Sequence, residues 1–268
     1  MARFNCIAAN TLDRLIGTPA APAVVDVRLE EDVAQIPFLI PTAIRCAHSD
    51  VANLCSQLGK RSTVLVCHKG LKLSHGAAAI LRSFGVRAEV LEGGMMGWSD
   101  AKLPALQLDR FPTGAPGSLW VTRQRPKIDR VACPWLIRRF VDVQAKFLFV
   151  PASEVLAVAD RFDAIPFDVS GAVWSHEDDK CTFDSLLNGF SLHSPALDRM
   201  AHIIRGADTN THSLAPESAG LLAFSVGLSR SYSDDLEQLE AGLPMYDALY
   251  RWARDGQRES HDWPGQHI

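Results

Sequence analysis

The first hundred residues alternate between two hydrophobic patterns. Short apolar runs rich in β-branched residues, at 23–27, 62–67 and 87–93, predict buried parallel strands. Between these runs, apolar positions recur at helical spacing around 49–58 and 74–84. Strands that alternate with helices are typical of a compact α/β domain built on a parallel sheet.

The pattern changes after residue 100. The next twenty residues are rich in proline and glycine and show no sustained period, so we interpret 106–117 as an interdomain linker and 1–105 as the first domain. Residues 118–256 then form a second domain. The polar residues 257–268 form a tail that we expect to fray.

The second domain begins with strand patterns and continues mainly with helical ones. A helix is predicted to begin at Asp129, an acceptable helix cap, directly after the first strand. The predicted strands are 118–123 and 145–150, and the later predicted helices are 153–161, 195–205, 216–232 and 234–254. We therefore expect an α/β parallel-sheet domain followed by an α+β, mainly helical domain.

The composition excludes several classes of protein. With 47% hydrophobic and 22% charged residues the chain is typical of a globular protein, and its net charge of −4 gives no overall attraction to nucleic acid or membranes. No apolar run approaches the roughly 20 residues that span a bilayer, and the N-terminus lacks a secretory signal pattern. We expect a cytoplasmic protein with no membrane partner, whose six scattered cysteines are free thiols.

One cysteine stands where a predicted strand turns into a predicted helix, in the segment VLVCHKGLKLSHGAAAI. Backbone N–H groups and the helix dipole converge on a sulfur in that position, which favours the thiolate of Cys67 and makes it a nucleophile. Gly70 supplies backbone freedom in the turn, and Lys69 and Lys72 add positive charge for an anionic substrate. Alternatively, Cys67 is only the buried last residue of a core strand.

Three motifs of the first domain resemble the rhodanese family. They are VVDVR at 24–28, CHKGLK at 67–72, which resembles the six-residue active loop, and LEGGMMGW at 91–98. Together they cover nearly the whole domain, so the resemblance implies a rhodanese-like parallel-sheet fold. A cysteine phosphatase would need an arginine six residues after the cysteine, where this chain has Leu73, so phosphatase chemistry is disfavoured.

The resemblance also implies a reaction. Cys67 would take a sulfane sulfur from a donor such as thiosulfate, hold it as a persulfide and pass it to a thiol acceptor. Lys69 and Lys72 would attract the anionic donor, and the loop amides around Gly70 would surround the transferred sulfur.

The start of the second domain is locally basic within an acidic chain. Guanidinium groups there suit a tetrahedral oxyanion or nucleic-acid phosphates, although salt bridges and solvated faces explain such residues equally well. The candidate anion-binding residues are Arg123, Arg125, Arg130, Arg138 and Arg139.

A second group of polar residues offers imidazole, carboxylate and thiolate donors that suit a divalent transition metal. The candidate ligands are His176, Cys181, Asp208 and His212. Their spacing matches no standard structural zinc pattern, and an ordinary hydrogen-bonded histidine is the alternative interpretation of His176.

Several long motifs in the second domain resemble the C-terminal domain of the bacterial chromate-resistance family, the B component of chromate operons. They are TRQRPKIDRVACPWLIRRF, FLFVP, PFDVSGAVWSHEDDKCTFD, IIRGADTNTHSLAPESAGLLA and LPMYDALYRWAR. The family implies a role in chromate resistance, generally described as chromate-responsive regulation of an efflux operon. Here a rhodanese-like domain stands on the N-terminal side, so a role in binding DNA is not favoured.

Our leading hypothesis is a cytoplasmic chromate-resistance protein that combines sulfur transfer in the first domain with sensing of chromate, a related oxyanion or a metal in the second. One alternative is a chromate-responsive DNA-binding regulator, although no confident helix-turn-helix pattern is visible. Another is a metal-dependent redox enzyme. Whether the chain forms a homodimer is left open.

Overall fold

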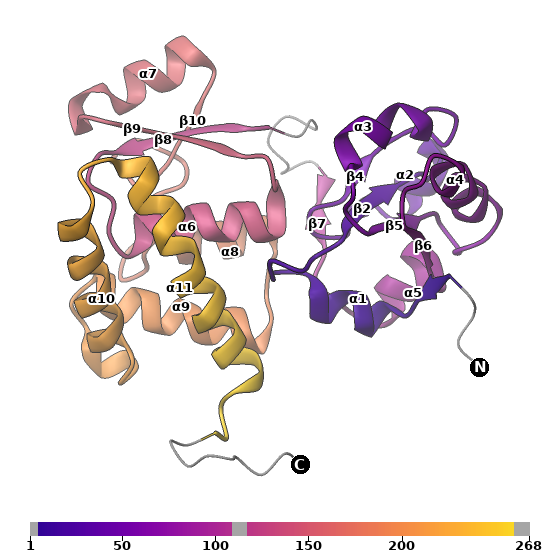
Figure 1. Cartoon of the computed structure of the whole chain (residues 1–268). Helices are drawn as coiled ribbons and strands as arrows, with labels where there is room; N and C mark the ends of the chain where they lie inside the picture. The colour runs from indigo at the N-terminus through magenta and orange to yellow at the C-terminus, as the bar shows by residue number, and fades with distance from the viewer. Residues whose placement is uncertain (1–4, 109–116, 260–268) are drawn as a thin grey trace. The chain divides into compact units, whose positions relative to one another are not determined.

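The computed structural model describes residues 5–108 and 117–259 and divides the chain into two compact units (Figure 1). The N-terminal unit comprises Met1–Ser118 with two short later segments, Ile137–Ala145 and Phe190–Leu192. The remaining residues, from Leu119 onwards, form the C-terminal unit. Most of the linker predicted at 106–117 and of the tail predicted at 257–268 lies outside the described residues.

The N-terminal unit is built on a five-stranded parallel sheet with strand order β1-β6-β5-β2-β4. Its elements are β1 (Cys6–Ile7), α1 (Ala9–Leu15), β2 (Ala23–Asp26), α2 (Glu30–Gln35), β3 (Phe38–Leu39), β4 (Ile44–Arg45), η1 (Val51–Leu54), α3 (Cys55–Leu58), β5 (Thr63–Val66), α4 (Lys72–Ser83), β6 (Ala88–Leu91), α5 (Gly94–Asp100), β7 (Leu106–Gln107) and η3 (Ile137–Val141).

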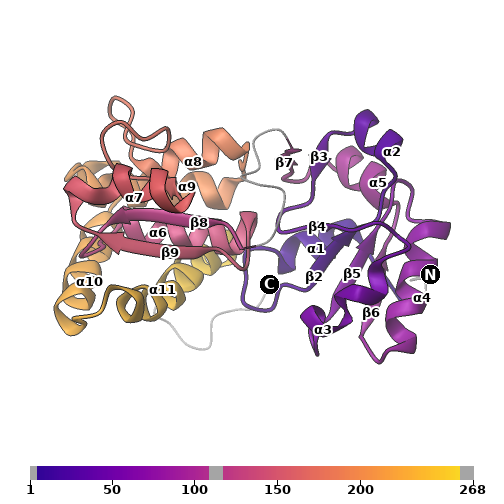
Figure 2. The same ribbon diagram turned by 90° about the horizontal axis from the view of Figure 1, so that it is seen from above.

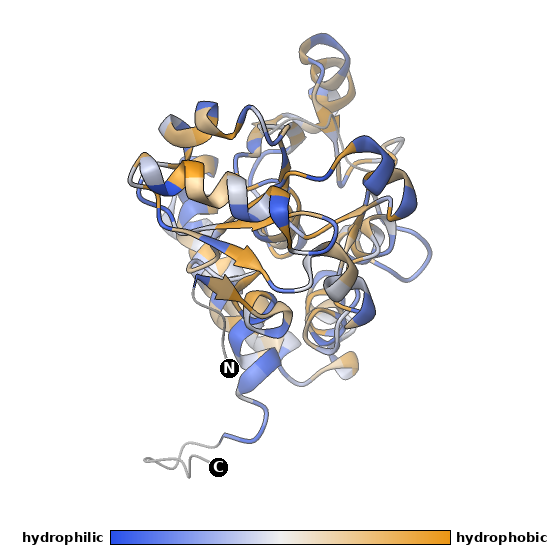
Figure 3. Ribbon diagram, turned by 90° about the vertical axis from the view of Figure 1, so that its right-hand side faces the viewer, coloured by the Kyte–Doolittle hydropathy of each residue, from blue (hydrophilic) through white to orange (hydrophobic). Residues whose placement is uncertain are grey.

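Helices cover both faces of this sheet. α3 and α4 pack on one face through Leu58, Ala78 and Leu81, and α1 and α5 lie on the other (Figures 1 and 2). Every residue of β2 and β5 is buried, as expected for central parallel strands covered on both sides. Figure 3 shows the strands of this unit mainly in the colours of hydrophobic residues.

The three strands predicted in the first domain all form, within two residues of the predicted bounds. The helix predicted at 49–58 is a 3₁₀ turn followed by a single α-helical turn, η1 and α3. Leu106–Gln107, which we assigned to the linker, instead pairs with Phe38–Leu39 in a small antiparallel sheet. Two-residue strands of this kind are too short to leave a hydrophobic period in the sequence.

The C-terminal unit combines a three-stranded parallel sheet, in the order β10-β8-β9, with several helices. Its elements are β8 (Leu119–Arg123), α6 (Asp129–Leu136), β9 (Lys146–Val150), η4 (Ala152–Glu154), α7 (Val155–Phe162), β10 (Ile165–Pro166), α8 (Thr182–Phe190), α9 (Pro195–Asp208), η5 (His212–Leu214), α10 (Ser218–Ser231) and α11 (Asp235–Asp255). α7 packs on one face of the sheet through Val155 and Ala159, and the other helices lie on the opposite side (Figure 1). The predicted fold classes, an α/β domain followed by a mainly helical α+β domain, are confirmed.

The helix predicted to begin at Asp129 changes its hydrogen-bond pattern after two turns. Pro134 has no N–H to donate to the preceding turn, and the α-helix ends at Leu136. The chain continues as the π-helical turn η3, in which the Asp142 amide donates to the carbonyl of Ile137, five residues back, at 2.8 Å. Among the described helices, none has the length and apolar character needed to cross a membrane.

A buried ion pair stabilises the edge of the N-terminal sheet after β2. The Arg28 and Asp26 side chains are 0% and 2% exposed, and Arg28 Nε donates to both carboxylate oxygens of Asp26 at 3.0 and 2.8 Å. Arg28 also donates to the carbonyls of Ile36 and Phe38 at 2.8 and 2.6 Å. One guanidinium therefore connects the end of β2 to the segment that leads into β3.

We expect Arg28→Ala to lower the free energy of unfolding by about 3–5 kcal/mol, because Asp26 would remain buried and uncompensated. Arg45→Ala is the matched control: its pair with the exposed Glu30 is worth about 0–1 kcal/mol and its bond to the Arg28 carbonyl about 1 kcal/mol, so the loss should be about 1–2 kcal/mol. Urea denaturation followed by circular dichroism measures both changes. Equal losses for the two variants would contradict this assignment.

Candidate functional site

The first candidate site is the loop that connects β5 to α4. Cys67 follows the last residue of β5, and its side chain is almost fully buried. The Leu71 amide donates to Cys67 Sγ at 3.2 Å, and the Ser74 hydroxyl lies 3.1 Å from the same sulfur. The Leu71 amide thus donates to the sulfur, whereas the one proton of the Ser74 hydroxyl is shared between the sulfur and the Leu71 carbonyl, which lies 3.0 Å from it.

Two glycines allow the loop to pack against the start of α5. A Cβ atom at Gly94, where φ is +59°, would overlap the carbonyl oxygen of Cys67 and the nitrogen of Gly70. The Met95 and Met96 amides, at the start of α5, donate to the carbonyls of Cys67 and His68 at 2.9 and 3.0 Å. The helix start therefore fixes the backbone of the cysteine loop. This contact is the physical role of Gly94, the second glycine of LEGGMMGW.

A cavity of about 420 Å³ opens over the loop. Its lining residues are Asp32, Cys67, His68, Lys69, Leu71, Lys72 and Leu73. Lys69 and Lys72 are exposed, so their positive charges stand beside the entrance while the sulfur lies at the base. The structure brings Cys67, Lys69 and Lys72 together at one cavity, with Gly70 in the turn between them.

The second candidate site is a group of carboxylates around one histidine in the C-terminal unit. Nε2 of His176 lies 3.3 Å from Asp168 Oδ1, 3.3 Å from Asp208 Oδ2 and 3.7 Å from Asp129 Oδ2. We call these four residues the carboxylate–histidine centre. One ligand atom each from Asp129, His176 and Asp208 lies within 4.8 Å of the others.

Several elements position the carboxylate–histidine centre. Asp129 begins α6, and its carboxylate accepts the first amides of α8, from Thr182 at 2.8 Å and Phe183 at 3.0 Å. Asp168 follows β10 and accepts a hydrogen bond from the Thr182 hydroxyl at 3.1 Å. Asp208 is the last residue of α9. Residues from distant parts of the sequence thus converge around the start of α8.

Burial sets the electrostatics of this centre. The pKa of the Asp129 carboxyl is raised well above its usual value, first by burial and then by the negative charges of Asp208 and Asp168. Burial also raises the pKa of Asp208, and the neighbouring His176 opposes that rise. Close carboxylates of this kind stay ionised together only beside positive charge.

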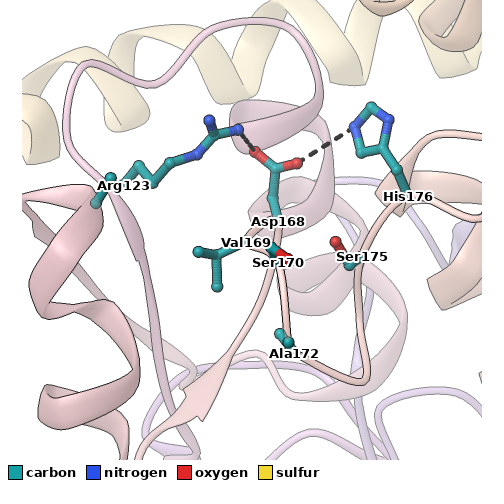
Figure 4. Close-up of a pocket in the computed structure, with 9 residues that line it drawn as sticks. Arg123, Asp168, Val169, Ser170, Ala172, Ser175 and His176 are labelled. Carbon is teal, nitrogen blue, oxygen red and sulfur yellow. Dashed lines mark hydrogen bonds and ion pairs between the residues drawn. The ribbon is translucent and has the colours of Figure 1, made fainter.

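Two arginines place positive charge beside Asp168. Arg123 Nη2 lies 2.8 Å and Arg130 Nε 3.1 Å from Asp168 Oδ2. Figure 4 shows Arg123 and His176 approaching the Asp168 carboxylate from its two sides. A cavity of about 690 Å³ adjoins this group and is lined by these three side chains and by Ser170 and Ser175, among others.

The other predicted arginines lie elsewhere. The Arg125 guanidinium donates to the backbone carbonyls of Ser229 and Tyr232, at the end of α10. Arg138 Nε donates to the Ala145 carbonyl at 3.1 Å, and Arg139 is the next residue of η3. Of the five candidate anion-binding residues, the structure places Arg123 and Arg130 together at Asp168.

Two of the predicted metal ligands, Cys181 and His212, do not belong to the carboxylate–histidine centre. Cys181 Sγ donates to Asp184 Oδ2 at 3.3 Å, and burial raises the pKa of this thiol. His212 lies in η5, where its Nε2 atom is buried and has no hydrogen-bond partner within the described chain. His176 and Asp208 are the two predicted ligands that the fold brings together.

Family comparisons assign both halves of the chain. The family model described as "ChrB, C-terminal domain" matches residues 120–253, half of the 268-residue sequence. The chain belongs to the ChrB C-terminal domain family. A second model, "Rhodanese-like domain", matches residues 8–101. The N-terminal unit therefore contains a rhodanese-like domain, and the C-terminal unit a ChrB-like domain, as both resemblances in the sequence predicted.

Individual relatives are similar over parts of their length. Protein ChrB of Cupriavidus metallidurans is 37% identical over 142 residues, which cover 53% of this chain and 42% of that protein. The chain thus spans less than half of the length of this curated relative.

Two solved structures are similar to a smaller part of this chain. A rhodanese-related protein from Thermoplasma volcanium is 22% identical over 39% of this chain and 99% of its own, with a TM-score of 0.34. Thiosulfate sulfurtransferase from Pseudomonas aeruginosa is 28% identical over 38% of this chain and 19% of its own, also with a TM-score of 0.34.

Sequence reasoning missed two members of the centre in the ChrB-like domain. Asp129 was interpreted only as a helix cap, and Asp168 belongs to the turn FDVS that follows a two-residue strand. The available signal was that Asp168 lies shortly after β10 and that Asp129 begins the helix that follows β8, because parallel strands bring the segments that leave them to one edge of the sheet.

In the rhodanese-like domain, Gly94→Ala should lower the free energy of unfolding by about 3 kcal/mol or more, because its Cβ would displace the cysteine loop. Gly85→Ala is the control: its φ is also positive, +82°, but nothing lies within 4 Å of the added Cβ, so it should cost only about 1–2 kcal/mol. Chemical denaturation compares the two. If Gly94→Ala costs no more than Gly85→Ala, the close backbone packing is not what fixes the loop.

Proposed function

We propose that the rhodanese-like domain is a sulfurtransferase in a protein that acts in chromate resistance, and that Cys67 carries the transferred sulfur as a persulfide. The observation that carries this proposal is the position of Cys67 Sγ. It lies at the base of a cavity of about 420 Å³, it faces the Leu71 amide and the Ser74 hydroxyl, and lysines stand at the entrance.

The reaction consists of two displacements at sulfur. The thiolate of Cys67 attacks the outer sulfur of thiosulfate, a new S–S bond forms, and the old S–S bond breaks to release sulfite with its electron pair. In the second step a thiophilic acceptor, cyanide in an assay or a thiol in a cell, attacks the outer sulfur of the persulfide. Its product leaves with that sulfur, and the Cys67 thiolate is regenerated. No external oxidant or reductant is needed.

Side chains and amides of the cysteine loop assist both displacement steps. Lys69 and Lys72 attract the dianionic donor to the cavity entrance. The Leu71 amide donates to the sulfur and stabilises negative charge as it moves between sulfur atoms. The Ser74 hydroxyl, which donates to the Leu71 carbonyl, would turn its proton to the sulfur when that charge develops. The contacts of the Met95 and Met96 amides with the loop carbonyls keep these hydrogen-bonding groups in place before thiosulfate binds.

Cys67→Ser should abolish thiosulfate:cyanide sulfurtransferase activity of the full chain, because the hydroxyl cannot form the persulfide. Cys46→Ser is the matched control, since Cys46 lies outside the cavity and its thiol donates to the neighbouring Ala47 carbonyl. Thiocyanate formation measures both variants. Activity retained in Cys67→Ser, or lost equally in Cys46→Ser, would remove Cys67 from the mechanism.

The ChrB-like domain supports a second proposal, binding of chromate or a related tetrahedral oxyanion. Arg123 lines the cavity of about 690 Å³, and its Nε atom is buried without a hydrogen-bond partner in the described part of the chain. An oxyanion in this cavity would supply an acceptor for that N–H. The membership of the domain in the ChrB family, together with the chromate-resistance role that we expect of that family, makes chromate the first ligand to test.

Calorimetric titration of the full chain with chromate should give heat that is lost in Arg123→Ala and retained in Arg161→Ala. Arg161 is an exposed arginine of α7 that does not line the cavity. Sulfate should compete, since it has the same shape and charge. No heat with the unaltered protein, or equal heat in both variants, would reject oxyanion binding at this position.

A further inference from the structure

The carboxylate–histidine centre contains more carboxylates than the neighbouring arginines neutralise. Arg123 and Arg130 make their ion pairs with Asp168. Among the described residues, no ion pair with an arginine is made by Asp129 or Asp208. Both of these carboxylates instead face Nε2 of His176, at 3.7 and 3.3 Å.

The fold holds these donors in place. Asp129 is 1% exposed, and three groups position its carboxylate: the Thr182 and Phe183 amides and the thiol of Cys133, which donates at 3.3 Å. Each amide binds a different oxygen of this carboxylate, and Asp129 Oδ2 also points toward His176. Donors held by a surrounding shell of hydrogen bonds are typical of metal centres.

The distances from His176 Nε2 are those expected between ligands of one cation. Bonds of about 2.0–2.2 Å from a metal to nitrogen and oxygen ligands separate adjacent ligand atoms by about 3.0–3.5 Å. The separations of His176 Nε2 from the oxygens of Asp168 and Asp208 are both 3.3 Å, and that from Asp129 is 3.7 Å. One ligand atom each from Asp129, His176 and Asp208 lies within 4.8 Å of the others, and Asp168 stands beside the same imidazole nitrogen.

We propose that Asp129, His176 and Asp208, together with Asp168, bind a divalent first-row transition ion. One imidazole among several carboxylates suits Mn²⁺, Fe²⁺ or Zn²⁺ better than Mg²⁺ or Ca²⁺, which prefer oxygen donors alone. The buried Cys133 and Cys181 donate their S–H protons to Asp129 and Asp184, so thiolates do not contribute.

The ion would add a function to the cavity beside the centre. His176 and Arg123 are each 41% exposed and line this cavity, so one side of the centre faces it. A bound cation with a coordination position directed toward the cavity would attract an anion there. The competing explanation is that the contacts of His176 with Asp168 and Asp208 satisfy these carboxylates and no ion binds.

The test uses the full chain, freed of metal with a chelator and then titrated with Mn²⁺ while the signal of free Mn²⁺ is followed by electron paramagnetic resonance. Zn²⁺ is added in competition. The site variants are Asp208→Asn and His176→Gln. Asp129 is left unchanged because it also holds the start of α8. The matched controls are Asp198→Asn and His193→Gln, which alter an exposed Asp–His pair at 3.2 Å outside the centre.

We expect one ion to bind per chain, with affinity lowered about tenfold or more in both site variants and unchanged in both controls. Circular dichroism establishes that each variant is folded, and metal should raise the melting temperature of the unaltered protein because it binds only the folded state. No binding of Mn²⁺ or Zn²⁺, or equal binding in folded site variants and controls, would overturn the proposal. His176→Gln should keep its sulfurtransferase activity, and Cys67→Ser should still bind the metal. The two variants therefore distinguish a failure of the metal site from a failure of the proposed sulfur transfer.

Discussion

The backbone of the cysteine loop and the backbone at the start of α5 lie so close together that no side chain fits between them. Gly94 approaches the Cys67 carbonyl and the Gly70 nitrogen, and the next two amides bind the loop carbonyls. This contact fixes a turn that would otherwise sample many conformations. A rigid turn keeps the Leu71 amide directed at Cys67 Sγ, and the reactivity that we propose for this cysteine depends on that geometry.

Both candidate sites follow from a property of parallel sheets. The carboxyl ends of parallel strands meet at one edge, where loops leave the sheet and polar groups gather. In the rhodanese-like domain this edge carries Cys67 after β5. In the ChrB-like domain it carries Arg123 at the end of β8 and Asp168 shortly after β10. The two sites differ in chemistry because the first offers hydrogen-bond donors to sulfur, whereas the second gathers carboxylates around an imidazole.

The sequence predicted most of the longer elements and missed most of the short ones. The strands around Val24, Leu65 and Val121 are apolar runs, and the long helices α9 and α11 show amphipathic spacing, so the sequence predicts both kinds. The short elements β7 and β10 contain two residues each and could not be found from periodicity.

The same limit applies to the sites. The cysteine loop is a contiguous motif and was located residue by residue. The carboxylate–histidine centre joins Asp129, Asp168, His176 and Asp208 from distant segments, so only tertiary structure reveals that Asp129 belongs to it and that Cys181 does not.

The central claim is that Cys67 becomes a persulfide, and mass spectrometry tests it most directly. The full chain is incubated with thiosulfate, separated from the reagent, and measured whole and as peptides without a reducing agent. Our account predicts a gain of one sulfur atom per chain, located on the peptide that contains Cys67 and released by cyanide. No added sulfur, or sulfur located on another of the six cysteines, would contradict it.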